Sequence, residues 1–338
     1  MLRIAMLSYW HVHAPDYTRQ IQQIPDTKIT VVWDEIPSRG REWASRLGAA
    51  FEPDLVAAVG REDVDAVIVD APTNRHAEVM VAAARAKKHI FTEKVLAPTV
   101  AEADEIVRSV REAGVQFCIS FPHRTRPAIL FAREAIDRGW LGQVTLLRAR
   151  IAHTGVIDAW LPSHFLDPVE CGGGALIDLG AHPMYVTEYL MGMPKRVSAR
   201  FNNVKKEIRV EDNAVAVLEY ENGSLAVVEA SFSSRFSPFT IEAHGTEGTL
   251  FIGFPGAAEV MIRSRKIGGA VEGWIVPERL PSPLPSPMQQ WVNAIRGGEP
   301  AKFGLEAARN LTELMQAANE SARKGEPVEL PLSHDRPT

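Results

Sequence analysis

Residues 64–92 read VDAVIVDAPTNRHAEVMVAAARAKKHIFT and contain a short strand, a helix and a second short strand. Residues 66–69 form a buried apolar run, residues 75–87 have the length and pattern of a helix, and residues 89–92 form another short run. A strand that reaches the next strand through a helix predicts that the two strands are parallel. The segment therefore predicts a parallel sheet in the N-terminal part of the chain.

The same alternation extends on both sides of this segment. Further short strand-like runs occupy residues 3–7, 29–33 and 116–120, and helical patterns begin at Ala14 and cover residues 37–47 and 99–113. Strands that alternate with helices of this length predict a doubly wound sheet covered on both faces. Residues 1–121 are thus interpreted as a Rossmann-type domain.

After residue 121 the pattern changes. Helices are expected at residues 126–138, from the glycines at 172–174 to about 191, and at residues 286–297 and 304–324. Strands are expected at residues 144–150, 195–201, 213–220, 224–232, 239–244 and 248–253, mostly without helices between them. Residues 122–338 therefore predict an α+β domain on a large, open, mainly antiparallel sheet, and the fold class is α/β plus α+β.

Composition excludes several classes of function. The 338 residues carry a net charge of −5 and no long basic block, which disfavours a duplex nucleic-acid partner. No uncharged apolar run approaches the roughly 18 residues of a membrane span. Cys118 and Cys171 form no C-x-x-C pair and are typical of reduced thiols, and the N-terminus has no secretory signal pattern. A cytoplasmic protein is expected.

The turn after the first strand departs from the dinucleotide fingerprint G-x-G-x-x-G. Residues 8–13 read SYWHVH, and the chain has no glycine before Gly40. Trp10 would crowd a pyrophosphate unless its ring points away from the turn. This turn alone leaves open a doubly wound domain that binds no nucleotide.

Asp34, at the end of the second expected strand, favours a domain that binds a nucleotide. A carboxylate there can accept hydrogen bonds from ribose hydroxyls and repel a 2′-phosphate. Asp34 could instead cap the following helix, and Arg39 could reach a 2′-phosphate. The sequence predicts NAD, with NADP as the less favoured cofactor.

Several longer motifs resemble one family of oxidoreductases. They are residues 64–76 (VDAVIVDAPTNRH), 88–97 (KHIFTEKVLA), 172–182 (GGGALIDLGAH), 211–214 (EDNA) and 242–250 (EAHGTEGTL). Together these segments resemble the Gfo/Idh/MocA family, named for glucose–fructose oxidoreductase, inositol dehydrogenase and MocA. Val95 stands where the family motif has proline. The resemblance spans about residues 3–330.

Three residues are candidates for catalysis. Imidazole titrates near neutral pH, so His182 is the candidate acid or base, and Asp178, four residues earlier, would orient it. Lys94 would stabilise negative charge on the reacting oxygen. The resemblance implies the same three roles. A helix-start aspartate and an ordinary buried histidine are the alternative interpretation.

The resemblance implies cofactor contacts near the strand ends, and the segment around the domain junction suggests substrate contacts. The predicted cofactor-binding residues are Ser8, Tyr9, Trp10, His11, Val12, Asp34, Pro72, Thr73, Asn74, His76 and Glu93. The predicted substrate-binding residues are Lys94, Arg124, His153, Trp160, His164, Asp178 and His182. Arg124 could instead form an ordinary ion pair, Trp160 could be core, and His76 could cap its own helix.

No metal site is predicted. His153, His164, Asp178 and His182 contain ligand-type side chains, but no H-x-H or H-E-x-x-H spacing connects them. His11 and His13 do form an H-x-H pair, but they lie in the turn at residues 8–13, where the cofactor is expected.

Three functions remain open at this stage. The leading hypothesis is an NAD-dependent dehydrogenase of a sugar, cyclic polyol or glycoside. The second is a redox-neutral enzyme in which transient oxidation enables elimination, glycoside cleavage or epimerisation. The third is a non-catalytic sugar- or nucleotide-binding or sensor protein. The open sheet predicts a homodimer or homotetramer.

Overall fold

The structure is a computed structural model that describes residues 1–267 and 273–332. The chain divides into two compact units. The first consists of Met1–Ser120 with Pro285–Thr312, and the second of Phe121–Leu284 with Glu313–Thr338. Among the described residues, no helix is long and apolar enough to cross a membrane.

A six-stranded parallel sheet forms the first unit, as the sequence predicts. Its order is β3-β2-β1-β4-β5-β6, and every neighbouring pair is parallel. The strands are β1 (Leu2–Leu7), β2 (Thr27–Trp33), β3 (Ala50–Phe51), β4 (Ala66–Val69), β5 (His89–Thr92) and β6 (Phe117–Ile119). All residues of β4 are buried, because helices cover both faces of a parallel sheet.

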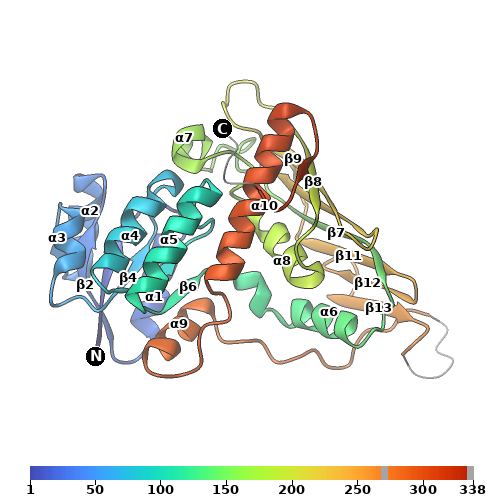
Figure 1. The fold of residues 1–338 in the computed structure, drawn as a ribbon, viewed down its shortest axis with the longest axis horizontal. Helices are drawn as coiled ribbons and strands as arrows, with labels where there is room; N and C mark the ends of the chain where they lie inside the picture. The colour runs from blue at the N-terminus through green and yellow to red at the C-terminus, as the bar shows by residue number, and fades with distance from the viewer. Residues whose placement is uncertain (268–272, 333–338) are drawn as a thin grey trace. The chain divides into compact units, whose positions relative to one another are not determined.

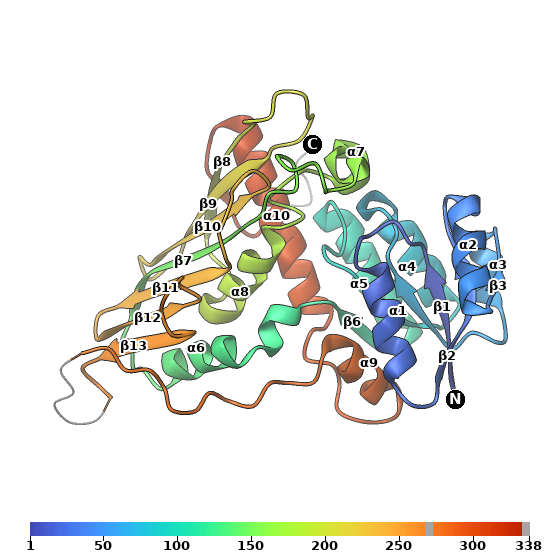
Figure 2. The same cartoon turned by 180° about the vertical axis from the view of Figure 1, so that it is seen from behind.

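Helices lie on both faces of this sheet. They are α1 (Ala14–Gln23), α2 (Pro37–Leu47), α3 (Leu55–Gly60), α4 (His76–Arg85), α5 (Val100–Ala113) and α9 (Pro287–Ile295). Figure 1 shows α4 and α5 in front of the sheet, and Figure 2 shows α1 in front from the opposite side. Thr99 and Glu102 form a capping box that begins α5, since each side chain bonds the other's backbone amide.

Helix α9 belongs to the first unit, although the sequence division assigns all of 122–338 to the second domain. Trp291 of α9 is fully buried, and its ring centroid lies 5.7 Å from that of Phe91 on β5. The amide of Ile119 on β6 also donates to the carbonyl of Phe303. These contacts join residues distant in sequence, which local periodicity does not reveal.

An eight-stranded mixed sheet forms the second unit. Its order is β13-β12-β11-β7-β10-β9-β8-β14. The strands are β7 (Val144–Ala152), β8 (Arg196–Asn202), β9 (Asn213–Glu219), β10 (Leu225–Ser231), β11 (Thr240–Gly245), β12 (Gly248–Ile252), β13 (Val260–Ser264) and β14 (Val328–Glu329). Pairing is antiparallel except between β7 and β10, so the mainly antiparallel prediction is confirmed and the parallel pair was not foreseen.

Helices cover one face of this sheet (Figures 1 and 2). They include α6 (Pro127–Asp137), α8 (Ala181–Met191) and the later part of α10 (Leu305–Lys324), whereas the short α7 (Pro168–Cys171) does not lie on the sheet. Along β10, Ala226, Val228 and Ala230 are buried, whereas Leu225, Val227 and Glu229 are partly or largely exposed. The predicted helix from the glycine run to residue 191 is shorter in the structure, because residues 175–180 form turns before α8 begins.

Trp291→Ala is expected to lower the free energy of unfolding by about 3–5 kcal/mol, because it leaves a large cavity between α9 and the parallel sheet. Chemical denaturation followed by circular dichroism measures the change. Trp274→Ala is the matched control, since that side chain is 44% exposed. Equal losses in the two variants would contradict the assignment of α9 to the core of the first unit.

Candidate active site

The turn between β1 and α1 accommodates its large side chains by packing them into the first unit. Trp10 is only 5% exposed, so its ring does not protrude across the turn. The ring of Tyr9 stacks on Trp43, with centroids 4.1 Å apart. Ser8 takes the left-handed φ of 79° that glycine usually supplies in tight turns. The crowding expected from Trp10 is therefore relieved by its burial.

Several amides of this turn donate within the chain. The amide of Tyr9 donates to Asp34 Oδ2 at 3.0 Å, that of Trp10 to Ser8 Oγ at 3.0 Å, and that of His11 to the Asp70 carbonyl at 3.2 Å. The turn still leads directly into α1, whose N-terminus favours an anion. A dinucleotide fits this strand–turn–helix arrangement with fewer backbone donors than a glycine turn offers.

Asp34 is buried at the end of β2 and bonded on several sides. It accepts the amides of Tyr9 and Ile36 and the guanidinium of Arg39, which approaches both carboxylate oxygens at 2.8 Å. Ile36, rather than Asp34, is the N-cap of α2. Arg39 also pairs with Glu35, so two carboxylates hold its guanidinium.

Glu93 is the centre of a buried polar network at the end of β5. Tyr17 on α1 donates a short hydrogen bond to its carboxylate, and His13 Nδ1 lies 3.3 Å from Glu93 Oε2. Tyr17 Oη also lies 2.7 Å from Ser120 Oγ. Burial alone would raise the pKa of Glu93, but the charges of His11 and His13 outweigh it and hold that pKa well below its usual value.

Lys94 follows Glu93 directly and is equally enclosed. Its side chain is 2% exposed, and Nζ lies 3.9 Å from Glu93 Oε1. A lysine ammonium can donate hydrogen bonds and stabilise a developing oxyanion.

The segment after β4 contains a short 3₁₀ turn and a histidine that bonds backbone carbonyls. Thr73 begins a short 3₁₀ turn, and Pro72, Thr73 and Asn74 lie at the carboxyl end of β4. The ring nitrogens of His76 lie 2.8 Å from the Val95 carbonyl and 3.0 Å from the Ala71 carbonyl. His76 therefore ties the β4 and β5 loops together, and this role differs from the predicted cofactor contact and from a helix cap.

The glycine run of the second unit is held by Glu211, which the sequence analysis did not single out for this role. The Glu211 carbonyl accepts the amide of Ala175 at 2.9 Å, and its carboxylate accepts the amide of Leu176 at 3.0 Å. A Cβ at Gly174 would lie 2.3 Å from the Glu211 carbonyl oxygen, so this close approach requires glycine. These hydrogen bonds and the close approach at Gly174 fix the turn that leads through Asp178 to α8.

His182 lies in the first turn of α8, and Tyr185 is its observed partner. Tyr185 Oη lies 3.1 Å from His182 Nδ1 and accepts the backbone amide of His123 at 3.1 Å. His182 is 8% exposed and Tyr185 is 1% exposed. The sequence analysis missed Tyr185, although its position three residues after His182 places both side chains on one helix face.

His123 packs beside this pair. Its ring stacks on Phe239 with centroids 4.5 Å apart, and its centroid lies 4.9 Å from that of His182. Burial, followed by the charge of Arg126, lowers the pKa of His123 to about 4. His123 is therefore neutral near pH 7 and adds no positive charge next to His182.

The other predicted substrate residues have varied surroundings. Arg124 lies 3.8 Å from Glu188 and packs over the ring of Tyr189, which matches the ion-pair alternative. His153 stacks on Phe232 and adjoins Trp160, which is 53% exposed. The carbonyl of His164 accepts the Cys171 thiol. His153 and Trp160 thus form a partly exposed aromatic pair in the second unit.

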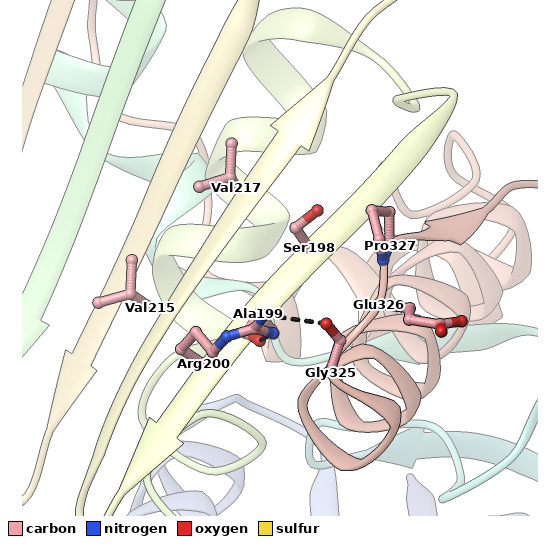
Figure 3. Close-up of a pocket in the computed structure, with 8 residues that line it drawn as sticks. All are labelled: Ser198, Ala199, Arg200, Val215, Val217, Gly325, Glu326 and Pro327. Carbon is pink, nitrogen blue, oxygen red and sulfur yellow. Dashed lines mark hydrogen bonds between the residues drawn. The ribbon is translucent and has the colours of Figure 1, made fainter.

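A shallow pocket lies away from all these residues, on β8, β9 and the loop after α10 (Figure 3). Arg200 spans it and donates to the Gly325 carbonyl at 2.9 Å. The other lining residues include Val215 and Val217, so the pocket is mainly apolar. It contains none of the predicted site residues.

Comparisons with known proteins match these two units. Residues 7–121 match the model described as "Oxidoreductase family, NAD-binding Rossmann fold", and residues 129–251 match "GFO/IDH/MocA C-terminal domain". The scyllo-inositol 2-dehydrogenase (NAD(+)) of Bacillus subtilis strain 168 is 28% identical, over 98% of this chain and 95% of that protein.

Two further relatives show the range of similarity. The 2,7-anhydro-N-acetylneuraminate hydratase of Escherichia coli K12 is 27% identical, over 75% of this chain and 67% of its own. A solved structure of levoglucosan dehydrogenase in complex with NADH and levoglucosan has a TM-score of 0.83 at 21% identity. It covers 98% of this chain and 100% of that one. The chain therefore belongs to the Gfo/Idh/MocA family of oxidoreductases, and its first unit is an NAD-binding Rossmann domain.

Proposed function

We propose that the protein is an NAD-dependent dehydrogenase that oxidises a hydroxyl of a sugar, cyclic polyol or glycoside. Two observations support the proposal, one in each unit: the first unit holds a buried Glu93–Lys94 pair, and the second holds a buried His182 whose ring contacts Tyr185. Similarity to an inositol dehydrogenase along nearly the whole chain supports the substrate class.

His182 is the proposed acid or base for the substrate hydroxyl. The Tyr185 phenol can accept a hydrogen bond from Nδ1–H of His182, which leaves a lone pair on Nε2 and allows it to serve as the base. Once Nε2 has taken the substrate proton, the imidazolium carries both protons and can serve as the acid in the reverse direction. Asp178 is proposed to orient the ring or to bind a second substrate hydroxyl.

Lys94 is proposed to donate a hydrogen bond to the same substrate oxygen. Its ammonium would stabilise the negative charge that develops there as the proton leaves. Glu93 is the ion-pair partner of this ammonium at a buried position. Bound NAD would supply the hydride acceptor for the carbon, so the hydroxyl proton and the hydride would go to different acceptors.

The remaining predicted contacts complete the proposal. Asp34 is proposed to bind the adenosine ribose, with the β1–α1 turn and the Pro72–Asn74 segment beside the rest of the dinucleotide. His153 and Trp160 are proposed to contact the sugar face, since aromatic rings pack on the apolar faces of sugars. Arg124 and His164 are the less favoured contacts, because Arg124 is paired with Glu188.

Lys94→Ala and His182→Ala are each expected to lower kcat by about two orders of magnitude or more. NADH absorbance with a panel that includes scyllo-inositol and levoglucosan measures the rates. Lys28→Ala, an exposed lysine on β2, is the control. Turnover at the wild-type rate in either variant would remove that residue from the mechanism.

Asp34→Asn is expected to raise the affinity for NADP relative to NAD by at least about tenfold, because it removes the repelling charge and releases Arg39. Calorimetric titration of both dinucleotides measures the ratio. Glu35→Gln is the matched control, since Glu35 also pairs with Arg39. An unchanged ratio in Asp34→Asn would show that Asp34 does not bind the ribose.

A redox-neutral reaction is the second candidate, favoured by similarity to the E. coli hydratase. Such an enzyme would consume substrate without net NADH, and cofactor would remain bound through purification. Product analysis alongside NADH absorbance separates the two reactions. If neither dinucleotide binds at millimolar concentration, both candidates fail and the non-catalytic hypothesis gains support.

We also infer self-association through the exposed face of the second sheet. Leu146, Val215 and Leu225 are each more than a third exposed on β7, β9 and β10. Burial of these side chains against a second copy would stabilise a dimer or tetramer. Light scattering at micromolar protein should give a multiple of 37.2 kDa, and a monomer mass would contradict the inference.

A further inference from the structure

Two histidines and two carboxylates gather at the carboxyl ends of β1, β4 and β5. One ring nitrogen of His11, one of His13 and one carboxylate oxygen of Glu93 all lie within 4.8 Å of one another. His11 and Glu93 are buried, whereas the side chain of His13 is 40% exposed. We propose that these three side chains bind a divalent transition-metal ion of the zinc type.

The donor set selects this class of metal. Imidazole nitrogens suit Zn²⁺, Fe²⁺, Co²⁺ and Ni²⁺, and two histidines with one carboxylate form a common three-ligand site. Mg²⁺ and Ca²⁺ prefer oxygen ligands throughout. Three protein ligands also leave a position for water or another molecule, and the exposure of His13 opens the site to solvent.

The distances suit a site that closes slightly around an ion. His13 Nδ1 and Glu93 Oε2 are 3.3 Å apart. Ligands of a tetrahedral zinc ion with bonds of about 2.1 Å lie about 3.4 Å apart, so this pair is already spaced for binding. Given the 4.8 Å limit, the third donor needs to approach by about 1.4 Å at most. His11 Nδ1 accepts a hydrogen bond of 3.2 Å from the His13 amide, which holds the His11 ring beside this site.

Asp70 supplies an independent reason for a cation here. It is fully buried, and neither carboxylate oxygen has a hydrogen-bond partner among the described residues. A buried carboxyl group without a hydrogen-bond partner is unfavourable, and a cation bound nearby would offset that cost.

The surroundings of Glu93 are those of a supported ligand. Tyr17 donates to its carboxylate, and Ser120 lies beside the Tyr17 hydroxyl. Hydrogen bonds of this kind orient metal ligands and strengthen binding. The competing interpretation is that His13, Glu93 and Tyr17 form only a hydrogen-bonded network that joins α1 to β5.

Zinc titration distinguishes these interpretations. Protein without an affinity tag, treated with a chelator and free of dinucleotide, is titrated with ZnCl₂ and separately with MgCl₂ by calorimetry. One equivalent of Zn²⁺ is expected to bind, and Mg²⁺ is expected not to bind. His13→Gln should weaken zinc binding by about 100-fold or more, because one of three ligands is lost.

His244→Gln is the matched control. His244 Nε2 lies 3.5 Å from Glu242 Oε2, so it is another histidine beside a glutamate on the protein surface. Zinc affinity should not change in this variant. Absence of zinc binding, or equal affinity in wild type and His13→Gln, would overturn the proposal.

Two further measurements guard against variants that fail to fold. Co²⁺ bound to the wild-type protein should show the visible absorption of a low-coordinate site, and the spectrum should change in Glu93→Gln. Thermal denaturation should show stabilisation by Zn²⁺ in wild type and not in His13→Gln. Because these experiments contain no dinucleotide, failure of zinc binding is distinguishable from failure of the proposed dehydrogenase activity.

Discussion

The buried carboxylate of Glu93 is the interaction on which the first unit's polar site depends. It lies at the end of β5 and holds Tyr17 of α1 and His13 of the preceding turn. A buried carboxylate is unfavourable without charge-assisted hydrogen bonds. The contacts of His13 and Tyr17 with Glu93 therefore fix the turn and α1 against the end of β5. Lys94 follows Glu93 directly in the chain, and its side chain is equally buried.

The turn at residues 8–13 keeps a tight strand-to-helix connection although it contains no glycine. Ser8 takes the left-handed backbone conformation, and its hydroxyl accepts the amide of Trp10. The rings of Tyr9 and Trp10 are buried, and the Tyr9 hydroxyl bonds Thr18 on α1. Burial of large side chains thus accompanies the loss of glycine from this turn.

Sequence patterns predicted the parts of the fold that depend on local periodicity. The six-stranded parallel sheet, its alternating helices and the mainly antiparallel second sheet all follow from strand lengths, helix spacing and turn residues. The placement of α9 and the parallel pairing of β7 with β10 depend on contacts between distant residues. Those contacts leave no periodic signal in the chain.

The candidate site divides in the same way. Motif resemblance predicts Glu93, Lys94, Asp178 and His182, but it does not predict what each side chain touches. Tyr185 was missed because nothing in the spacing alone shows that the buried phenol bonds His182 Nδ1 rather than a backbone carbonyl. His76 was assigned to the cofactor, yet its ring nitrogens face the carbonyls of Val95 and Ala71.

Histidines in the turn change what the strand ends can bind. A glycine turn offers neutral backbone amides, whose donor character does not vary with pH. Neutral imidazoles offer lone pairs to a cation, and protonated imidazoles offer charge to an anion. Because Glu93 is ionised beside them, a cation and the protons of His11 and His13 compete for the same electron pairs. Whatever binds this turn is therefore coupled to the protonation of its two histidines, a coupling that a glycine-rich turn does not have.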